Sequence, residues 1–173
     1  MAWRNPLDAD GRAGQNWPAM KRPIQTLPPG ERDLVLTRMF DAPRELVWQA
    51  FTDPSRAIAW WGPRAHPATT MQMDVRVGGS WRICLTGVED GRALWQHGVF
   101  REVERPRRLA FTFVWEEEGE RGVETLVEID FEERAGKTVM SFRQGAFLSA
   151  GERDGHMGGW SSTFDRLADF LAL

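Results

Sequence analysis

The sequence predicts an α+β domain in which a curved antiparallel sheet of six to seven strands is closed by one long C-terminal helix. At residues 33–40 and again between residues 68 and 144, apolar residues mostly alternate with polar ones, which is typical of strands with one buried face. Short turns, many of them containing glycine, separate these segments, so consecutive strands are expected to pair antiparallel. From about residue 154 to residue 172 the apolar spacing changes to three and four, which is typical of one amphipathic helix.

The first strand is expected at residues 33–40, and two short helices follow it. Asp41 is a candidate cap for the first helix, RELVWQAFT. Pro43 suits a first helical turn, because the N–H that proline lacks needs no partner there. The second helix is expected at residues 55–61, and Gly-Pro then ends the helical region.

The remaining strands are expected in an unbroken series. Their predicted ranges are 68–77, 80–87, 93–103, 108–115, 123–133 and 137–144. A sheet of this length twists and curls, and its apolar face still needs a cover. The final helix supplies that cover, with apolar residues at helical spacing: Met157, Trp160, Phe164, Leu167, Ala168 and Leu171.

Residues 1–32 are predicted to form a Pro- and Gly-rich tail ahead of a single domain at residues 33–173. The first 30 residues hold five Pro and three Gly and show no periodic apolar pattern. Such a segment buries too little surface to offset its ordering entropy. Trp3, Trp17 and Ile24 are candidate anchors of the tail on the domain or on a partner chain.

Composition excludes several classes of protein. The net charge of −3 argues against general nucleic-acid binding, which usually needs a basic face. The single cysteine, Cys84, excludes an intramolecular disulfide and a multi-cysteine metal site. No membrane span is expected, because no stretch of about 18 apolar residues occurs. The first residues are polar and lack an apolar signal core, so a cytoplasmic location is expected.

Neither a metal nor a cofactor is expected. The three histidines, His66, His97 and His156, do not show the spacing of a metal-binding motif. The segment at residues 77–80 is predicted to be a hairpin turn rather than a phosphate-binding loop. No Ser-His-Asp or Cys-His arrangement is legible, so no catalytic residue is assigned.

Four separated motifs resemble one family, in the right order. They are LTRMFDAPRELVWQAFTDPSRAIAWWGP at 36–63, VRVGGSWR at 75–82, GVFREVERPRRLAFTF at 98–113 and GHMGGWSSTFDRLADFL at 155–171. They resemble the activator of heat-shock protein 90 ATPase-like group of the SRPBCC superfamily, over about residues 33–172. That superfamily has the START-like, or helix-grip, fold and includes the birch-pollen allergen, polyketide cyclases and lipid-transfer domains. The resemblance implies the order β-α-α-β6-α and a cavity between sheet and long helix.

A ligand site is predicted between the sheet and the final helix. Nine Trp and ten Phe in one small domain favour either a lined cavity or a solid core, and for any single residue the core is favoured. His97 and His156 are the candidate polar groups of this site. The candidate ligand-binding residues are Trp60, Trp61, Met73, Trp81, Ile83, His97, Phe111, Phe113, Trp115, His156, Met157, Trp160 and Phe164.

Three functions remain open at this stage. The favoured one is binding of a small apolar or aromatic ligand. The second is an enzyme of polyketide-cyclase or hydrolase type, which would need His97 or His156 and an arginine to meet inside one cavity. The third is a protein-interaction module of co-chaperone type with a chaperone partner, because residues 31–173 carry 18 basic and 23 acidic residues. An exposed edge strand could also pair two copies in a homodimer.

Overall fold

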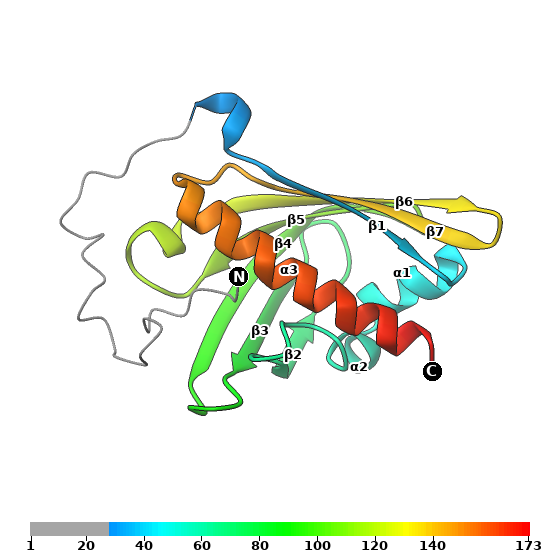
Figure 1. Ribbon diagram of the computed structural model, residues 1–173, viewed down its shortest axis with the longest axis horizontal. Coiled ribbons are helices and arrows are strands. Elements are labelled where there is room, and N and C mark those ends of the chain that lie inside the picture. The colour runs from blue at the N-terminus through cyan, green and yellow to red at the C-terminus, as the bar shows by residue number, and fades with distance from the viewer. Residues whose placement is uncertain (1–27) are drawn as a thin grey trace.

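The computed structural model describes residues 28–173, so the predicted tail anchors Trp3, Trp17 and Ile24 lie outside the described residues. Figure 1 shows one curved sheet with α3 running along it. The elements are η2 (Pro29–Glu31), β1 (Leu34–Phe40), α1 (Arg44–Thr52), α2 (Pro54–Ala57), β2 (Ala68–Met73), β3 (Ser80–Thr86), β4 (Ala93–Glu104), β5 (Arg108–Trp115), η3 (Gly119–Gly122), β6 (Thr125–Arg134), β7 (Lys137–Gly145) and α3 (Ala150–Leu171). Within residues 28–173, no helix is both long and apolar enough to cross a membrane.

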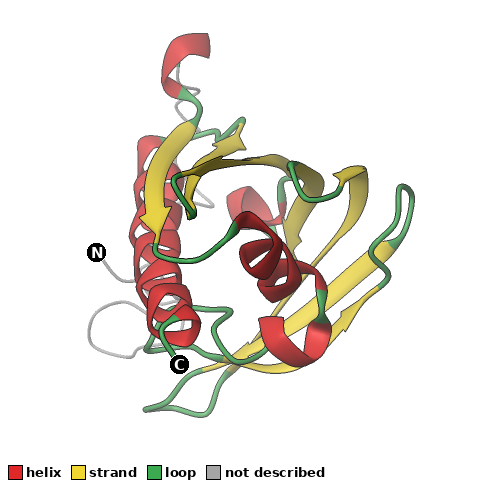
Figure 2. Cartoon of the chain, turned by 90° about the vertical axis from the view of Figure 1, so that its right-hand side faces the viewer, coloured by secondary structure: helices red, strands yellow, loops and turns green. Residues whose placement is uncertain are grey.

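The seven strands form one antiparallel sheet in the order β1-β7-β6-β5-β4-β3-β2. From β2 to β7 each strand pairs with its neighbour in sequence, as the short turns predict. β1 lies at the far edge beside β7, with Leu34 opposite Gln144. Figure 2 shows α1 and α2 in the opening of the curved sheet, while α3 closes its side. The predicted helix-grip architecture is therefore confirmed.

The inner face of the sheet is aromatic because inward positions of β5 carry large rings. Phe111, Phe113 and Trp115 alternate there and are buried. From α3, Trp160 and Phe164 pack onto this face, and their rings stack with centroids 5.5 Å apart. Burying each such ring stabilises the fold by roughly 2 kcal/mol relative to leaving it exposed. The apolar residues that occur at helical spacing in the sequence thus form the face through which α3 packs on the sheet.

One indole is held flat against the middle of the sheet. The Trp81 Nε1 donates to the carbonyl oxygen of Thr112 at 3.1 Å, and the Thr112 Oγ1 accepts from the backbone N–H of Val99 at 2.9 Å. Gly98 lies directly under this contact. A Cβ at Gly98 would stand 1.7 Å from the Thr112 carbonyl oxygen and 2.5 Å from the Trp81 Nε1. Only glycine leaves room for so close an approach.

The start of α1 and the end of α2 differ from the prediction. Pro43, not Asp41, occupies the N-cap position of α1, and no side chain caps that end. At α2 the Asp53 Oδ1 accepts from the Ser55 N–H at 3.0 Å, so Asp53 caps this helix. α2 ends at Ala57, and the following residues form a turn.

β2 is shorter than predicted. It ends at Met73, whereas the alternating pattern extends to Val77. The backbone turns between these residues: the Gly79 N–H donates to the Arg76 carbonyl at 2.8 Å, and the Asp74 N–H donates to the Ser80 carbonyl at 2.9 Å. Because of this turn Val77 is exposed rather than on the inner face.

α3 begins four residues earlier than predicted. Its N-cap is Ser149, whose Oγ accepts from the Glu152 N–H at 3.2 Å. Ser149 and Glu152 have the S-x-x-E spacing of a capping box, a signal that the apolar periodicity alone misses. The helix then runs through Gly158 and Gly159 without a break.

A buried hydroxyl fixes the start of α1 to the sheet, and its loss is expected to be measurable. Thr138 on β7 is fully buried, and its Oγ1 donates to the Ala42 carbonyl at 2.7 Å. Thr138→Val keeps the shape but leaves that carbonyl without this donor, so the free energy of unfolding should fall by about 1 kcal/mol. Chemical denaturation measures the change, and Thr37→Val on the exposed side of β1 is the matched control. Equal stability of both variants would contradict the assigned role.

Candidate functional site

The structure gathers most of the predicted ligand-binding residues into or against one aromatic core. Twelve of the thirteen lie there, and the exception is His97. The twelve are Trp60, Trp61, Met73, Trp81, Ile83, Phe111, Phe113, Trp115, His156, Met157, Trp160 and Phe164. Ring contacts run through the whole set; for example, Trp61 lies 5.5 Å from Trp160 and 6.3 Å from Trp81 between centroids. The sequence therefore predicted which residues gather on the inner side of the sheet, and their role in ligand binding stays a prediction.

The cavity expected in this core is filled by its own side chains. Small voids remain between them. One, of about 10 Å³, is lined by Phe51, Trp61, Met73, Trp81, Phe100, Leu109 and Phe111. Another, also of about 10 Å³, is lined by Phe113, Trp115, Glu120, Arg121, Val123, Thr125, Ala146, Phe147, Leu148, Glu152 and His156. Each is close to the least volume that holds one water molecule.

His97 does not face the core. Its side chain is 45% exposed on the outer face of the sheet, and its Nδ1 lies 3.1 Å from the Glu116 Oε1. The Arg82 Nε donates to that same carboxylate oxygen at 2.8 Å. The prediction that His97 projects into the cavity is therefore wrong. The reason is strand parity, because Leu94, Gln96, Gly98 and Phe100 take the inner positions of β4.

Met157 lies at the boundary between core and solvent. It packs against the aromatic core and also lines an open groove of about 690 Å³ on the outside of α3. The other residues of this groove are Pro63, Arg64, Ala65, His66, Asp154, Gly158, Ser161, Ser162 and Asp165. Ligand sites of several hundred Å³ are common, so the groove is large enough to hold a small-molecule ligand.

A network of buried polar groups joins α3 to the sheet. Gln144 on β7 is at its centre: its Oε1 accepts from the Trp160 Nε1 at 2.7 Å and lies 3.2 Å from the His156 Nδ1. Its Nε2 donates to the Thr125 Oγ1 at 2.9 Å. On the far side of the imidazole, the Trp115 Nε1 donates to the His156 Nε2 at 3.1 Å. We call these five residues the interior polar network.

The network fixes the tautomer of His156. An indole N–H only donates, so the Nε2 that receives the Trp115 hydrogen must be unprotonated. The Gln144 Oε1 only accepts, so the Nδ1 that faces it must carry the proton. His156 is therefore a neutral imidazole with its proton on Nδ1, and both ring nitrogens are engaged.

Burial and charge act on His156 in the same direction. The loss of hydration on complete burial holds the pKa of His156 well below its usual value, and the positive charge of Arg121 lowers that pKa further. The Glu152 Oε2 lies 3.7 Å from the His156 Nε2, a distance typical of an ion pair. We do not assign an ion pair, because this nitrogen carries no proton in the neutral tautomer.

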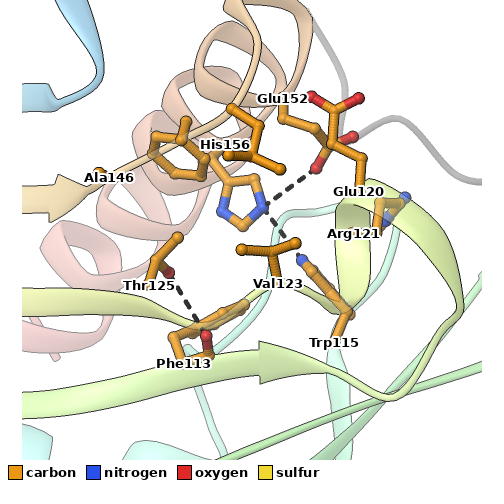
Figure 3. A pocket seen from close by; sticks show the side chains of 11 residues that line it. Phe113, Trp115, Glu120, Arg121, Val123, Thr125, Ala146, Glu152 and His156 are labelled. Atoms are coloured by element: carbon orange, nitrogen blue, oxygen red, sulfur yellow. Dashed lines mark hydrogen bonds and ion pairs between the residues drawn. The ribbon is translucent and has the colours of Figure 1, made fainter. Parts of the chain in front are cut away.

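Arg121 stands at the end of the core beside His156, as Figure 3 shows. It is 4% exposed, its guanidinium lies 4.6 Å from the centroid of the Trp115 ring, and its Nε lies 3.3 Å from the Glu117 Oε2. Burial lowers the pKa of Arg121, which the charges of Glu117 and Glu152 oppose. We call Glu117, Glu120, Arg121 and Glu152 the mouth cluster. The segment around η3 and the first turn of α3 carry them, and these two segments lie at the opposite end of the domain from α1 and α2 (Figure 1).

His66 lies in the outer groove and is also affected by the charge of Arg121 in the mouth cluster. It lines the groove, and partial burial lowers its pKa, with Arg121 lowering it further and Asp90 opposing. One cation therefore acts on both His66 and His156. Among residues 28–173, no group of three or more His, Cys, Asp or Glu side chains is arranged to hold a metal ion.

The positions of His156 and Arg121 bear on the hypothesis that the protein is an enzyme of polyketide-cyclase or hydrolase type. His156 and Arg121 do line one small void, as that alternative requires. Both ring nitrogens of His156 are nevertheless hydrogen-bonded within the protein, so the imidazole is not placed to exchange a proton with a substrate. The geometry suits binding better than acid–base chemistry.

Gln96, Arg121 and Gln144 are among the buried polar residues that sequence reasoning missed. The glutamines left a readable signal. Gln96 continues the inward set of β4 and Gln144 continues that of β7, so each stands at an apolar position of an alternating strand. Arg121 left no such signal, because it lies in η3, within an acidic, Gly-containing segment that is typical of a solvated turn.

Solved structures similar to this chain share its fold. Protein CV1439 from Chromobacterium violaceum superposes with a TM-score of 0.75 at 23% identity, covering 81% of this chain and 96% of that one, and at this identity it shows the fold alone. The AHSA1 protein from Silicibacter pomeroyi gives 0.71 at 26% identity, with 81% and 97% covered. Protein Ms6760 from Mycobacterium smegmatis gives 0.70 at 26% identity, with 82% and 91% covered. Among curated proteins there is no match.

The sequence also matches a protein family directly. The match is to the family described as Activator of Hsp90 ATPase homolog 1-like protein, and it covers residues 41–172. It spans the two short helices, all strands after β1, and α3. Membership supports a ligand-binding or co-chaperone-like module at the level of the family. The chain belongs to the Activator of Hsp90 ATPase homolog 1-like protein family.

Proposed function

We propose that this domain binds a small apolar or aromatic molecule between its sheet and α3. One observation carries the proposal: three large polar side chains, Gln96, Gln144 and His156, are buried on the inner side of a core that is mostly aromatic and aliphatic. Burying polar groups costs free energy, so a core that served stability alone would be better filled with apolar side chains. Ligand sites, by contrast, combine apolar walls with a few polar groups that orient the ligand.

The groove beside α3 supports a route of entry. Met157 separates this groove from the aromatic core, and Gly158 next to it has no side chain to obstruct passage. Methionine has three rotatable bonds and adapts its shape easily. A change of the Met157 rotamer would therefore open the interior toward solvent at this point.

The filled interior limits the ligand to a small molecule that displaces side chains. Met73, at the wall of the first void, lies on the edge strand β2, which pairs on one side only. An edge strand with a flexible methionine yields more readily than the central strands do. Binding would thus select an opened conformation, and part of the interaction free energy would be spent on opening it.

A bulky residue at position 157 is expected to block this site. N-phenyl-1-naphthylamine, whose fluorescence rises in apolar surroundings, should bind the wild-type protein, and Met157→Trp should weaken that binding at least about tenfold, or ~1.4 kcal/mol. The matched control is Met39→Trp, because Met39 lies exposed on the outer side of β1. Titration of the probe fluorescence measures all three affinities, and circular dichroism confirms that each variant is folded.

Two results would count against the proposal. If neither this probe nor a panel of flat apolar compounds bound the wild-type protein, the interior would be a solid core and the co-chaperone-like alternative would be favoured. If the probe bound and both tryptophan variants weakened it equally, the site would not lie beside Met157.

A further inference from the structure

One glutamine of the core has no hydrogen-bond partner in the part of the chain that the structure describes. Gln96 is 1% exposed on the inner face of β4, directly opposite Ile83 on β3 and Trp115 on β5. Within residues 28–173, neither its Nε2 nor its Oε1 has a hydrogen-bond partner. Nearly all buried polar groups in folded proteins are paired, so an orphaned carboxamide requires an explanation.

Gln144 shows that this fold can satisfy a buried glutamine. It is also fully buried, yet its Oε1 accepts from Trp160 and faces the donor of His156, and its Nε2 donates to Thr125. The two glutamines lie on the same inner face, one in a complete network and one without partners. The difference indicates that Gln96 is kept for something other than the fold.

The surroundings of Gln96 suit a flat ring. Trp115 lies across from it on β5, and the Trp81 indole covers Gly98, which is the next inward position along β4. The Phe113 ring lies 5.6 Å from that of Trp81 and 5.5 Å from that of Trp115, so a planar molecule that displaced it would present its edge to the carboxamide. Aromatic rings in such positions add about 1 kcal/mol to binding beyond the area that they bury.

We propose, on the basis of the ligand-binding function above, that Gln96 recognises an uncharged aromatic ligand with a hydrogen-bond donor and acceptor side by side on one edge. A carboxamide offers one N–H and one carbonyl oxygen on the same edge, so a lactam or cyclic amide can form two parallel hydrogen bonds with it. A charged ligand would have to leave water without a free counter-ion on the inner face, which is costly. The described cation nearest the core, Arg121, is already beside Glu117.

Three probes of equal shape test this inference. 2-Quinolone has an adjacent N–H and C=O, coumarin keeps the C=O but replaces the N–H with a ring oxygen, and naphthalene has neither. The wild-type protein should bind 2-quinolone at least about tenfold more tightly than coumarin, because a carboxamide oxygen left facing the ring oxygen is unpaired. Quenching of tryptophan fluorescence and isothermal titration measure the affinities.

Substitution at position 96 should remove the preference without removing the binding. Gln96→Leu is expected to bind the three probes within about threefold of one another, and Gln96→Met is a second, more flexible isostere in case the leucine variant folds poorly. Gln72→Leu is the matched control, because Gln72 is an exposed glutamine on β2, and it should keep the wild-type preference.

The outcomes separate the inference from the proposed function. Equal affinities of the wild-type protein for 2-quinolone and coumarin would overturn the role of Gln96 while leaving ligand binding intact. So would a crystal structure in which one ordered water joins Gln96 to protein groups and stays in place when 2-quinolone is bound. Failure of all three probes to bind would instead contradict the ligand-binding function itself.

Discussion

Replacing Gly98 with alanine is expected to lower the free energy of unfolding by about 3 kcal/mol or more. The new Cβ would lie 1.7 Å from the Thr112 carbonyl oxygen, which belongs to the backbone and cannot rotate away. It would also lie 2.5 Å from the Trp81 Nε1, which donates to that same carbonyl. β4 and β5 would have to separate locally, and the Trp81 indole would leave the inner face.

Urea denaturation followed by circular dichroism at 222 nm would measure this loss. Gly30→Ala is the matched control, because a Cβ there meets no atom within 4 Å and the variant should be as stable as the wild-type protein. A Gly98→Ala protein that lost less than about 1 kcal/mol would show that the two strands can move apart at little cost. Binding of apolar probes should weaken in the same variant, since Trp81 forms part of the inner wall.

The architecture was predictable because two periodicities in the sequence are strong. Alternation in β3, β5 and β6 and the spacing of three and four in α3 each specify one buried face, and a sheet with one apolar face requires a cover. The observed ends of helices and strands differ from the predicted ends where local hydrogen bonds determine the boundary. The turn after Met73 and the Ser149 cap are examples, because a carbonyl or hydroxyl at the right place outweighs a continuing apolar pattern.

The candidate site was predictable in its aromatic part only. Apolar residues at inward positions follow directly from strand parity, whereas a polar residue at such a position can be read either as a pattern error or as a functional group. Gln96 and Gln144 occupy such positions, and the sequence cannot tell that one is satisfied and the other is not. The prediction for His97 was wrong for a simpler reason. Neighbouring residues of a strand face opposite sides of the sheet, and this part of β4 is oriented by Leu94 and Phe100, which face inward.

The filled interior was beyond prediction from spacing. Whether large rings leave a cavity or interdigitate depends on their rotamers. The Trp81 indole lies flat because Gly98 makes room beneath it and the Thr112 carbonyl accepts its N–H. Such a contact joins residues 31 positions apart in the chain, and no local pattern encodes it.

The second large predicted effect is a loss of stability at acid pH. The free energy of unfolding is expected to fall as the pH decreases below about 6.5, at up to about 1.4 kcal/mol per pH unit, because His156 must stay neutral in the folded protein. Its pKa is held well below the usual 6.5 by burial and by Arg121, whereas in the unfolded chain the imidazole protonates near that value. Below pH 6.5 the unfolded state therefore binds more protons than the folded state does, and acid favours unfolding.

His156→Gln should remove most of this dependence. Glutamine can still accept from Trp115 and donate toward Gln144, so the interior polar network keeps a donor and an acceptor at this point. Between pH 6.5 and pH 5 the wild-type protein should lose up to about 2 kcal/mol more stability than the variant does. Urea denaturation at a series of pH values measures the two slopes, and a small shared slope is expected from His66, whose pKa is also lowered by burial.

His97→Gln distinguishes this effect from a general response to acid. The substitution is the same, but the side chain at position 97 lies on the outer face beside Glu116, so this variant keeps His156 and should keep the steep loss of stability in acid. The assignment of His156 would be wrong if its glutamine variant lost stability with decreasing pH as steeply as the His97 variant. In that case His156 would be protonated in the folded protein. Glu152, whose Oε2 lies 3.7 Å from the His156 Nε2, would then be its counter-ion.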